Sequence, residues 1–327
     1  MRQILLNAPG ELIERHVEPP SAVPGEALVR IRRVGVCGSD FNAFAGRHPI
    51  YTYPRVLGHE LSGMVIDVPK NDAGIVPGDS CAIDPYIYCN TCKACLAGRT
   101  NCCENLRLYG VHVDGGMQSL LSVRIDLLHT SRTLSLDQLA LIETLGIGAH
   151  AVKRSGLKEG ESALVIGAGP IGLGVITFAH LAGATVQIME PNPWRRKFGE
   201  SMGAKVVTNI NGRVADAVFD VTGSAESMRS SLEHVAVGGR LVFVGLTKEP
   251  VVIDDGLLHR REITIYASRN SCNQFPRIIR LMEEGQIITE PWITDRMLLS
   301  EVPQRLKDLP DKPTLIKAVV ELTDLDE

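Results

Sequence analysis

The chain has 327 residues, of which 44% are hydrophobic and 22% charged, a composition typical of a folded protein and too apolar for a disordered one. Its 34 basic and 38 acidic residues give a formal net charge of −4 at pH 7. Because no basic stretch stands out, we expect no nucleic-acid partner, and the length favours two domains.

The first 130 residues favour a β-rich domain. Short apolar runs such as residues 27–31 alternate with many glycine and proline turns. The first apolar run, residues 4–6, is too short for the core of a secretion signal, and the acidic Glu11 follows closely. We therefore expect a cytoplasmic protein.

Two short motifs in this region carry side chains that bind metals. Cys37 lies in a glycine-rich segment, residues 34–40, and His59 and Glu60 form a second motif. Taken separately, a single cysteine is most often a small core residue, and a His-Glu pair often lies in a solvated turn. Together they offer a thiolate, an imidazole and a carboxylate, the ligand types of a zinc site with an open position. Spacing alone does not decide between these interpretations.

Five of the eight cysteines lie between residues 89 and 103. Gaps of two residues let successive thiolates converge on one ion, so Cys89, Cys92, Cys95 and Cys103 predict a structural zinc site with four thiolate ligands. On spacing alone Cys102 could replace Cys103. A disulfide framework is the alternative, but it is typical of short secreted chains, whereas cytosolic thiols stay reduced. We expect the zinc to stabilise a loop that has no core of its own.

Glu143 stands in an apolar run that is predicted to be helical. A buried carboxylate is costly unless it is paired or bound to a metal, which makes Glu143 a further candidate ligand. Beyond it, residues 162–189 contain no Asp, Glu, Lys or Arg and are long enough to resemble a membrane span. The glycines and Pro170 in this stretch fit a buried strand, a turn and a helix better. We expect no membrane partner.

Residues 163–190 predict a dinucleotide-binding unit. An apolar strand, residues 163–166, precedes a Gly-x-Gly-x-x-Gly turn at residues 167–172, a helix that ends at Gly183 and a second strand at residues 185–189. The glycines let the backbone approach a pyrophosphate at the helix amino terminus. Glu190 stands 18 residues after Gly172, where an acid can hydrogen-bond the adenosine ribose. A carboxylate there favours NAD over NADP, although Arg195 and Arg196 could accommodate a phosphate.

Strand and helix patterns continue to alternate as far as residue 267. Strands are predicted at residues 218–221, 240–245 and 263–267, with a helix at residues 227–237. Repeated β-α units predict a doubly wound parallel sheet, which binds its ligand at the carboxyl ends of the strands.

The combined motifs resemble the zinc-dependent medium-chain dehydrogenase/reductase family, in particular its sorbitol dehydrogenase-like branch. The resemblance covers nearly the whole chain and rests on residues 35–40, 58–63, 89–103, 109–116, 167–172 and 267–270. It implies an α/β fold with a chaperonin-10-like, β-rich catalytic domain, residues 1–143 with 268–327. It also implies a Rossmann NAD-binding domain, residues 144–267.

The resemblance also implies the roles of individual residues. It places a catalytic zinc on Cys37 and His59, with Glu60 and Glu143 as carboxylates at the metal, and relatives differ in which residue binds directly. Ser39 can relay the proton of the substrate, and His48 can extend the relay to solvent. Asn42 departs from the family, since many relatives have histidine there. The implied cofactor residues are Gly167, Gly169, Pro170, Ile171, Gly172, Glu190, Arg195, Thr222, Ser268 and Arg269.

The implied activity is a zinc- and NAD-dependent interconversion of a secondary alcohol and a ketone. The substrate is expected to be a polyol or a sugar acid, as in L-galactonate or L-gulonate 5-dehydrogenases. A threonine-type or simple alcohol dehydrogenase is the alternative among enzymes. A non-catalytic zinc- and NAD-binding sensor or scaffold is the alternative of another class, and the joint presence of Cys37, His59, Glu60 and Ser39 argues against it. The resemblance further implies a homodimer or homotetramer formed through the NAD-binding domains.

Overall fold

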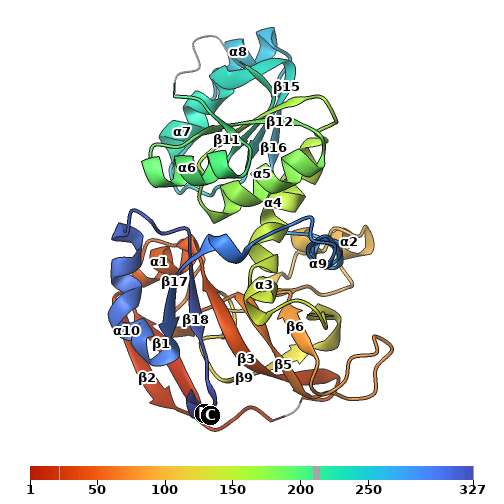
Figure 1. Ribbon diagram of the computed structural model, residues 1–327, viewed down its shortest axis with the longest axis vertical. Coiled ribbons are helices and arrows are strands. Elements are labelled where there is room, and N and C mark those ends of the chain that lie inside the picture. Colours follow the sequence, from red (N-terminus) through yellow and green to blue (C-terminus); the bar gives the residue numbers. More distant parts are fainter. Residues whose placement is uncertain (22, 209–213, 327) are drawn as a thin grey trace. The chain divides into compact units, whose positions relative to one another are not determined.

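The computed structural model describes residues 1–21, 23–208 and 214–326 (Figure 1). The chain divides into two compact units, Met1–Glu143 with Phe275–Glu327, and Thr144–Gln274. We expected the returning segment of the first unit to begin at residue 268. In the structure residues 268–274 group with the second unit, where the Ser268 N–H donates to Phe243 O at 2.9 Å.

The first unit consists mainly of β-strands whose side chains alternate between buried and exposed positions, as β3 shows most clearly. In the described chain its larger sheet has the order β10-β6-β5-β3-β18-β17, with β9 paired to β3. A second sheet has the order β2-β1-β4, and β7 pairs with β8. The strands are β1 (Arg2–Ala8), β2 (Glu11–His16), β3 (Glu26–Val36), β4 (Arg55–Val56), β5 (Glu60–Asp67), β6 (Ser80–Ile83), β7 (Tyr86–Ile87), β8 (Arg107–Leu108), β9 (Leu120–Arg124), β10 (Leu128–Thr130), β17 (Ile293–Leu298) and β18 (Lys317–Glu321).

The helices of this unit are short and connect or cover the strands. They are α1 (Gly38–Phe44), α2 (Lys93–Leu96), α3 (Leu136–Ala140), α9 (Phe275–Glu283) and α10 (Val302–Arg305), with 3-10 turns η1 (Thr100–Cys102), η2 (Ile125–Leu127), η4 (Glu290–Trp292), η5 (Leu299–Glu301), η6 (Leu306–Asp311) and η7 (Asp324–Asp326). Helix α4 (Ile142–Ser155) begins in the first unit and continues into the second.

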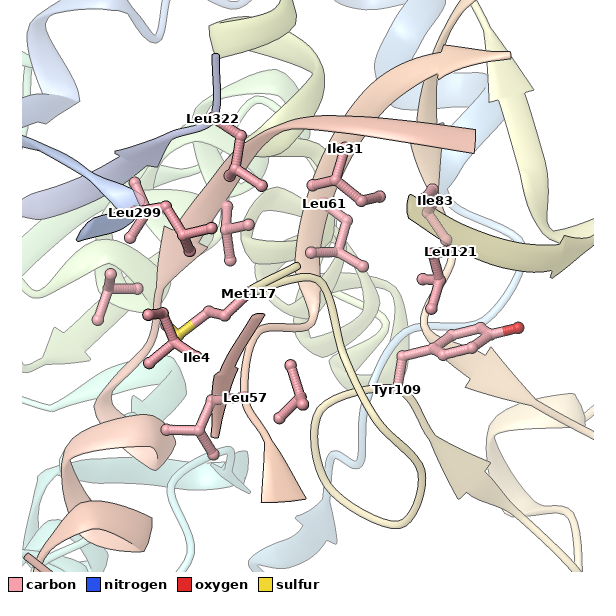
Figure 2. Close-up of a cluster of buried hydrophobic side chains, with 14 of the residues drawn as sticks. Ile4, Ile31, Leu57, Leu61, Ile83, Tyr109, Met117, Leu121, Leu299 and Leu322 are labelled. Carbon is pink, nitrogen blue, oxygen red and sulfur yellow. The ribbon is translucent and has the colours of Figure 1, made fainter. Parts of the chain in front are cut away.

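The core of the first unit joins side chains from distant parts of the sequence (Figure 2). Ile4 of β1, Leu61 of β5 and Leu299 near the end of the chain are each at most 1% exposed. Each such side chain contributes roughly 1.5–3 kcal/mol when it is fully buried. This shared core holds the returning carboxyl-terminal segment against the amino-terminal strands.

The return of the chain brings β18 beside β3. The two strands are antiparallel, and Ala318 lies opposite Val36, the last residue of β3. This register places Lys317 at the end of β3, next to Cys37.

The second unit is built around a parallel sheet with the order β13-β12-β11-β14-β15-β16. Order and parallel pairing confirm the predicted doubly wound fold. Its elements are β11 (Ser162–Ile166), α5 (Pro170–Leu181), β12 (Thr185–Met189), α6 (Pro193–Ser201), β13 (Lys205–Val206), β14 (Ala215–Asp220), α7 (Ala225–Ser230), η3 (Ser231–His234), β15 (Val235–Phe243), α8 (Asp255–Arg260) and β16 (Thr264–Ala267).

The predicted helix at residues 227–237 is wrong in its last three residues. Helix α7 ends at Ser230 and the 3-10 turn η3 continues to His234, but β15 begins at Val235, which pairs with Ala215 of β14. The pairing of this valine in the sheet outweighs the helical pattern of the preceding residues. Among the described residues, no helix combines the length and the apolar character that crossing a bilayer requires.

Candidate functional site

Cys37, His59 and Glu60 meet because the strands that carry them are paired. Cys37 directly follows β3, and His59 directly precedes β5. In the antiparallel register Gly35 lies opposite Glu60. One ligand atom from each of Cys37, His59 and Glu60 lies within 4.8 Å of the others. A Cβ atom at Gly35 would lie 2.1 Å from Glu60 Oε2, so only glycine leaves room for this carboxylate.

Asp40, which we did not predict, supports this cluster from α1. It is fully buried and its Oδ2 accepts the backbone N–H of Cys37 at 2.9 Å. Its Oδ1 lies 3.9 Å from His59 Nδ1. Burial raises the pKa of Asp40 and the neighbouring His59 lowers it, with a net rise. A carboxylate behind a histidine is the usual device that orients a metal-binding imidazole.

The cluster fits a zinc ion by its donor chemistry and its charge. Thiolate, imidazole and carboxylate are ligands that zinc accepts in catalytic sites. Burial lowers the pKa of His59, but Cys37, Asp40 and Glu143 together raise it well above 6.5. The side chains around His59 therefore attract positive charge. His59 Nδ1 and Asp40 Oδ1 are also buried without a hydrogen-bond partner in the part of the chain that the structure describes.

Lys317 forms a buried ion pair with Glu60 that we did not predict from the sequence. Its Nζ donates to Glu60 Oε1 at 2.7 Å and to Oε2 at 2.6 Å, and contacts Val36 O at 3.3 Å. The exposed fractions are 2% for Lys317 and 1% for Glu60. Burial lowers the pKa of Lys317, but the charges of Glu60, Cys37 and Glu143 outweigh this and raise it. Both oxygens of Glu60 are thus held by an ammonium group.

Glu143 is held by a different partner. It lies at the start of α4 and is 5% exposed, and Tyr86 OH donates to its Oε1. Burial raises the pKa of Glu143, and the charge of His59 lowers it, with a net rise. Among the described residues, the group of ligand atoms within 4.8 Å includes Glu60 and not Glu143. The distances between ligand atoms therefore favour Glu60 as the metal ligand. The hydrogen bonds favour Glu143, because Lys317 binds both oxygens of Glu60 whereas Tyr86 binds only one oxygen of Glu143.

Ser39 and His48 both lie next to a residue that we did not predict, Tyr51. Ser39 is on α1, and its Oγ is buried. The rings of His48 and Tyr51 pack edge to face, with centroids 4.7 Å apart. Burial and the charge of Asp40 raise the pKa of Tyr51 well above 10, although Ser39 beside it lowers the pKa. Tyr51 is therefore a neutral phenol near neutral pH.

The cysteine-rich loop forms a second cluster. Ligand atoms of Cys89, Cys92, Cys95 and Cys103 all lie within 4.8 Å of one another. Cys103 is buried and its Sγ accepts the N–H groups of Cys89 and Asn105, each at 3.3 Å. Hydrogen bonds from Thr91 and from backbone N–H groups lower the pKa of Cys89 to about 5, which favours the thiolate that zinc requires. Cys102, the alternative on spacing, is exposed and lies outside this cluster.

This geometry predicts opposite results for two neighbouring cysteines. Cys103→Ser is expected to weaken zinc binding by the loop more than ~100-fold, because one of four thiolates is lost. Cys102→Ser is the matched control and is expected to retain the metal. Zinc release can be followed with a colorimetric chelator during mild heating. Loss of the metal from the Cys102 variant alone would contradict the assignment.

The glycine turn of the second unit has the backbone that pyrophosphate binding requires. Gly167, directly after β11, has φ +99°, a conformation that glycine adopts without strain. A Cβ atom at Gly172 would lie 2.0 Å from Gly167 O. Gly169 is the N-cap of α5, whose first residues are Pro170 and Ile171, so this turn opens directly onto a helix amino terminus.

Glu190 lies at the end of β12 beside a cavity of about 510 Å³. Its carboxylate accepts the N–H groups of Ala168 at 2.7 Å and Asn192 at 2.8 Å. These bonds fix its orientation and leave further lone pairs on both oxygens. The residues that line the cavity include Gly167, Glu190, Arg196, Thr222, Ser224 and Ser227.

The remaining predicted cofactor residues, Arg195, Ser268 and Arg269, are not among the described residues that line this cavity. Arg195 Nη1 lies 3.9 Å from the position of a Cβ atom on Gly169, so its guanidinium is next to the glycine turn. Ser268 and Arg269 follow the carboxyl end of β16 and are not among the described residues lining the cavity.

Comparison with known proteins gives a consistent result over both units. The family described as alcohol dehydrogenase GroES-like domain matches residues 23–132, and the family described as zinc-binding dehydrogenase matches residues 170–284. The L-galactonate-5-dehydrogenase of Escherichia coli strain K12 is 36% identical over 98% of both chains. The 2-dehydro-3-deoxy-L-galactonate 5-dehydrogenase of Pseudoalteromonas atlantica is 31% identical over 98% of this chain and 97% of its own. A structure from Sinorhizobium meliloti 1021, described as a zinc-binding dehydrogenase bound to NADP, superimposes with a TM-score of 0.88 at 29% identity over 98% of each chain.

Proposed function

Because this chain belongs to the zinc-type medium-chain dehydrogenase family, we propose that it oxidises a secondary hydroxyl of a sugar acid or polyol to a ketone with NAD⁺. The observation that carries the proposal is the buried cluster of Cys37, His59 and carboxylates beside Ser39. The names of two relatives above support a sugar acid of the L-galactonate type as the substrate.

In this proposal Cys37 and His59 hold the catalytic zinc, and Glu143 is the third protein ligand. Lys317 already binds both oxygens of Glu60, whereas Tyr86 binds one oxygen of Glu143 and leaves the other available. Glu60 then acts next to the metal as a carboxylate whose charge is balanced by Lys317. Asp40 orients His59, and the cluster Cys89, Cys92, Cys95 and Cys103 holds the structural zinc.

The residues around the cluster have separate roles in the proposed reaction. Bound zinc lowers the pKa of an alcohol oxygen, and bound NAD⁺ accepts a hydride. The Ser39 hydroxyl receives the proton that the substrate hydroxyl loses and passes its own proton on. His48, which packs against Tyr51, carries the proton toward solvent. Burial of Ser39 Oγ keeps bulk water from competing for this proton.

The proposed cofactor site is the glycine turn and the cavity next to Glu190. The amino terminus of α5 and Arg195 attract the pyrophosphate, and Glu190 accepts hydrogen bonds from the adenosine ribose. Thr222 contributes from the cavity wall, and we place Ser268 and Arg269 nearer the nicotinamide end. The carboxylate of Glu190 disfavours a 2′-phosphate and so selects NAD over NADP.

Removing the charge of Glu190 tests this preference. Glu190→Gln is expected to lower kcat/KM for NAD⁺ by about 10-fold, since one good hydrogen bond to a charged group is weakened. The same change is expected to raise the relative use of NADP⁺. Glu200→Gln, on the exposed side of α6, is the control. An unchanged NAD⁺/NADP⁺ ratio in the Glu190 variant would contradict this role.

We further propose a homodimer or homotetramer assembled through the second unit. Strand β16 is at the edge of the parallel sheet in the described chain, a position where a strand of a second copy can pair with it. A cytoplasmic location fits the eight cysteines, since thiolate zinc ligands persist where thiols stay reduced.

Formation of NADH, measured by its absorbance, tests the substrate class. The panel consists of aldonates including L-galactonate, several polyols, threonine, and short alcohols, each with NAD⁺ and with NADP⁺. We expect turnover of a sugar acid or a polyol with NAD⁺. Turnover of threonine or ethanol alone would favour the alternative dehydrogenase and reject the proposed class.

A further inference from the structure

Two buried hydroxyls beside the metal-binding cluster lack a hydrogen-bond partner of good geometry. Tyr51 is 7% exposed, and its OH lies beside Ser39 Oγ, but among the residues that the structure describes neither hydroxyl makes a hydrogen bond of good geometry. Buried hydroxyls almost always form a hydrogen bond, and a buried hydroxyl without one indicates that a ligand is absent or needs another explanation. In the proposed reaction Ser39 binds the substrate hydroxyl that loses its proton. The proposed reaction assigns no such partner to the Tyr51 hydroxyl.

The loop that carries Tyr51 holds it in this position. Tyr53, two residues later, donates its hydroxyl to Ala43 O of α1 at 2.5 Å. The ring of Tyr51 packs edge to face against His48, at an interplanar angle of 72°. The two tyrosines therefore differ in whether the fold uses their hydroxyl groups. The hydroxyl of Tyr53 is used within the fold, and that of Tyr51 lies beside Ser39 and close to Asp40 and Cys37.

From this arrangement we propose that Tyr51 is a specificity-determining residue whose hydroxyl binds a second oxygen of the substrate, on the carbon next to the one that is oxidised. The inference rests on the proposed function, because Ser39 must bind the reacting hydroxyl. Because Tyr51 OH lies beside Ser39, a substrate whose reacting hydroxyl binds Ser39 would bring its neighbouring carbon close to Tyr51 OH. A neutral phenol both donates and accepts, so it binds a vicinal hydroxyl.

A substrate without that second oxygen leaves the Tyr51 hydroxyl buried and unpaired in the complex. Sites built to bind a hydroxyl discriminate strongly against analogues that lack it, for this reason. Tyr51 thus accounts for a preference for polyhydroxylated substrates over simple secondary alcohols.

The test compares Tyr51→Phe with the control Tyr53→Phe on two substrates, L-galactonate and 2-butanol. In Tyr51→Phe we expect kcat/KM for L-galactonate to fall about 10- to 100-fold, while that for 2-butanol changes less than about 3-fold. The ratio of kcat/KM for L-galactonate to kcat/KM for 2-butanol therefore falls. An equal loss on both substrates would assign Tyr51 to proton relay or to structure and would overturn the proposal, as would no loss on either.

Thermal unfolding of the free protein supplies a readout that does not depend on activity. Tyr51→Phe removes an unsatisfied hydroxyl, so its midpoint of unfolding is expected to equal or exceed that of the wild type. Tyr53→Phe breaks the bond to Ala43 O and is expected to lower the midpoint. A lower midpoint in Tyr51→Phe would mean that the fold itself uses the hydroxyl and would overturn the proposal. If the wild type oxidises neither a polyol nor a sugar acid, the proposed function fails first, and the assignment of Tyr51 fails with it.

Discussion

Replacing Cys37 by alanine is expected to reduce turnover by at least about 10³-fold while the protein stays folded. The thiolate is a ligand of the proposed catalytic zinc, and metal polarisation of the substrate oxygen lowers the barrier by several kcal/mol. Cys37 lies at the end of β3 and is only partly buried, so its loss leaves no large cavity in the core. The cysteine-rich loop does not contain this residue and keeps its own metal.

Metal analysis on the same samples separates loss of the site from loss of the fold. The wild type is expected to bind one zinc ion at each of its two clusters, and the Cys37 variant is expected to bind only at the four cysteines. Cys102→Ala, an exposed cysteine outside both clusters, serves as the control and should retain full turnover and both ions. NADH formation at the normal rate by Cys37→Ala would show that the active site lies elsewhere.

Replacing Lys317 by methionine is expected to lower the free energy of unfolding by about 3–5 kcal/mol. The substitution removes the ammonium partner of Glu60, whose side chain is 1% exposed and would be left buried without an opposite charge. An unpaired buried charge is among the most destabilising changes that a single substitution can make. Denaturant unfolding monitored by fluorescence measures the effect.

Two further variants show whether this cost comes from charge. Adding Glu60→Gln to Lys317→Met removes the unpaired carboxylate and should recover much of the lost stability. Lys312→Met removes a more exposed ion pair, with Asp295, where about 1 kcal/mol or less is expected. If Lys317→Met is no more destabilising than Lys312→Met, the ion pair between Lys317 and Glu60 does not contribute the free energy of unfolding that we assign to it.

Predictions from the sequence succeeded where the required residues are close together in the chain. The two-residue gaps of Cys89, Cys92 and Cys95 and the glycines at residues 167–172 describe local geometry, and the structure brings each set together. The alternation of strands and helices was sufficient to predict the doubly wound sheet. The choice between Cys102 and Cys103 needed the structure, since spacing alone allows both.

Partners that meet only through strand register could not be predicted in this way. Lys317 and Glu60 are 257 positions apart and meet because β18 and β5 flank the same strand, β3. Tyr86 reaches Glu143 from a two-residue strand that carries no recognisable signal. A lysine within the apolar run at residues 315–320 was the one available sign of a buried partner.

We propose above that Cys37 and His59 hold one metal ion together with a glutamate. A crystal of the zinc-loaded protein, measured on both sides of the zinc absorption edge, locates every zinc by its anomalous signal. We expect one peak within coordination distance of Cys37 Sγ and a nitrogen of His59, and a second among Cys89, Cys92, Cys95 and Cys103. A fully loaded crystal with a peak at the four cysteines and none beside Cys37 and His59 would show that these two residues do not form a zinc site.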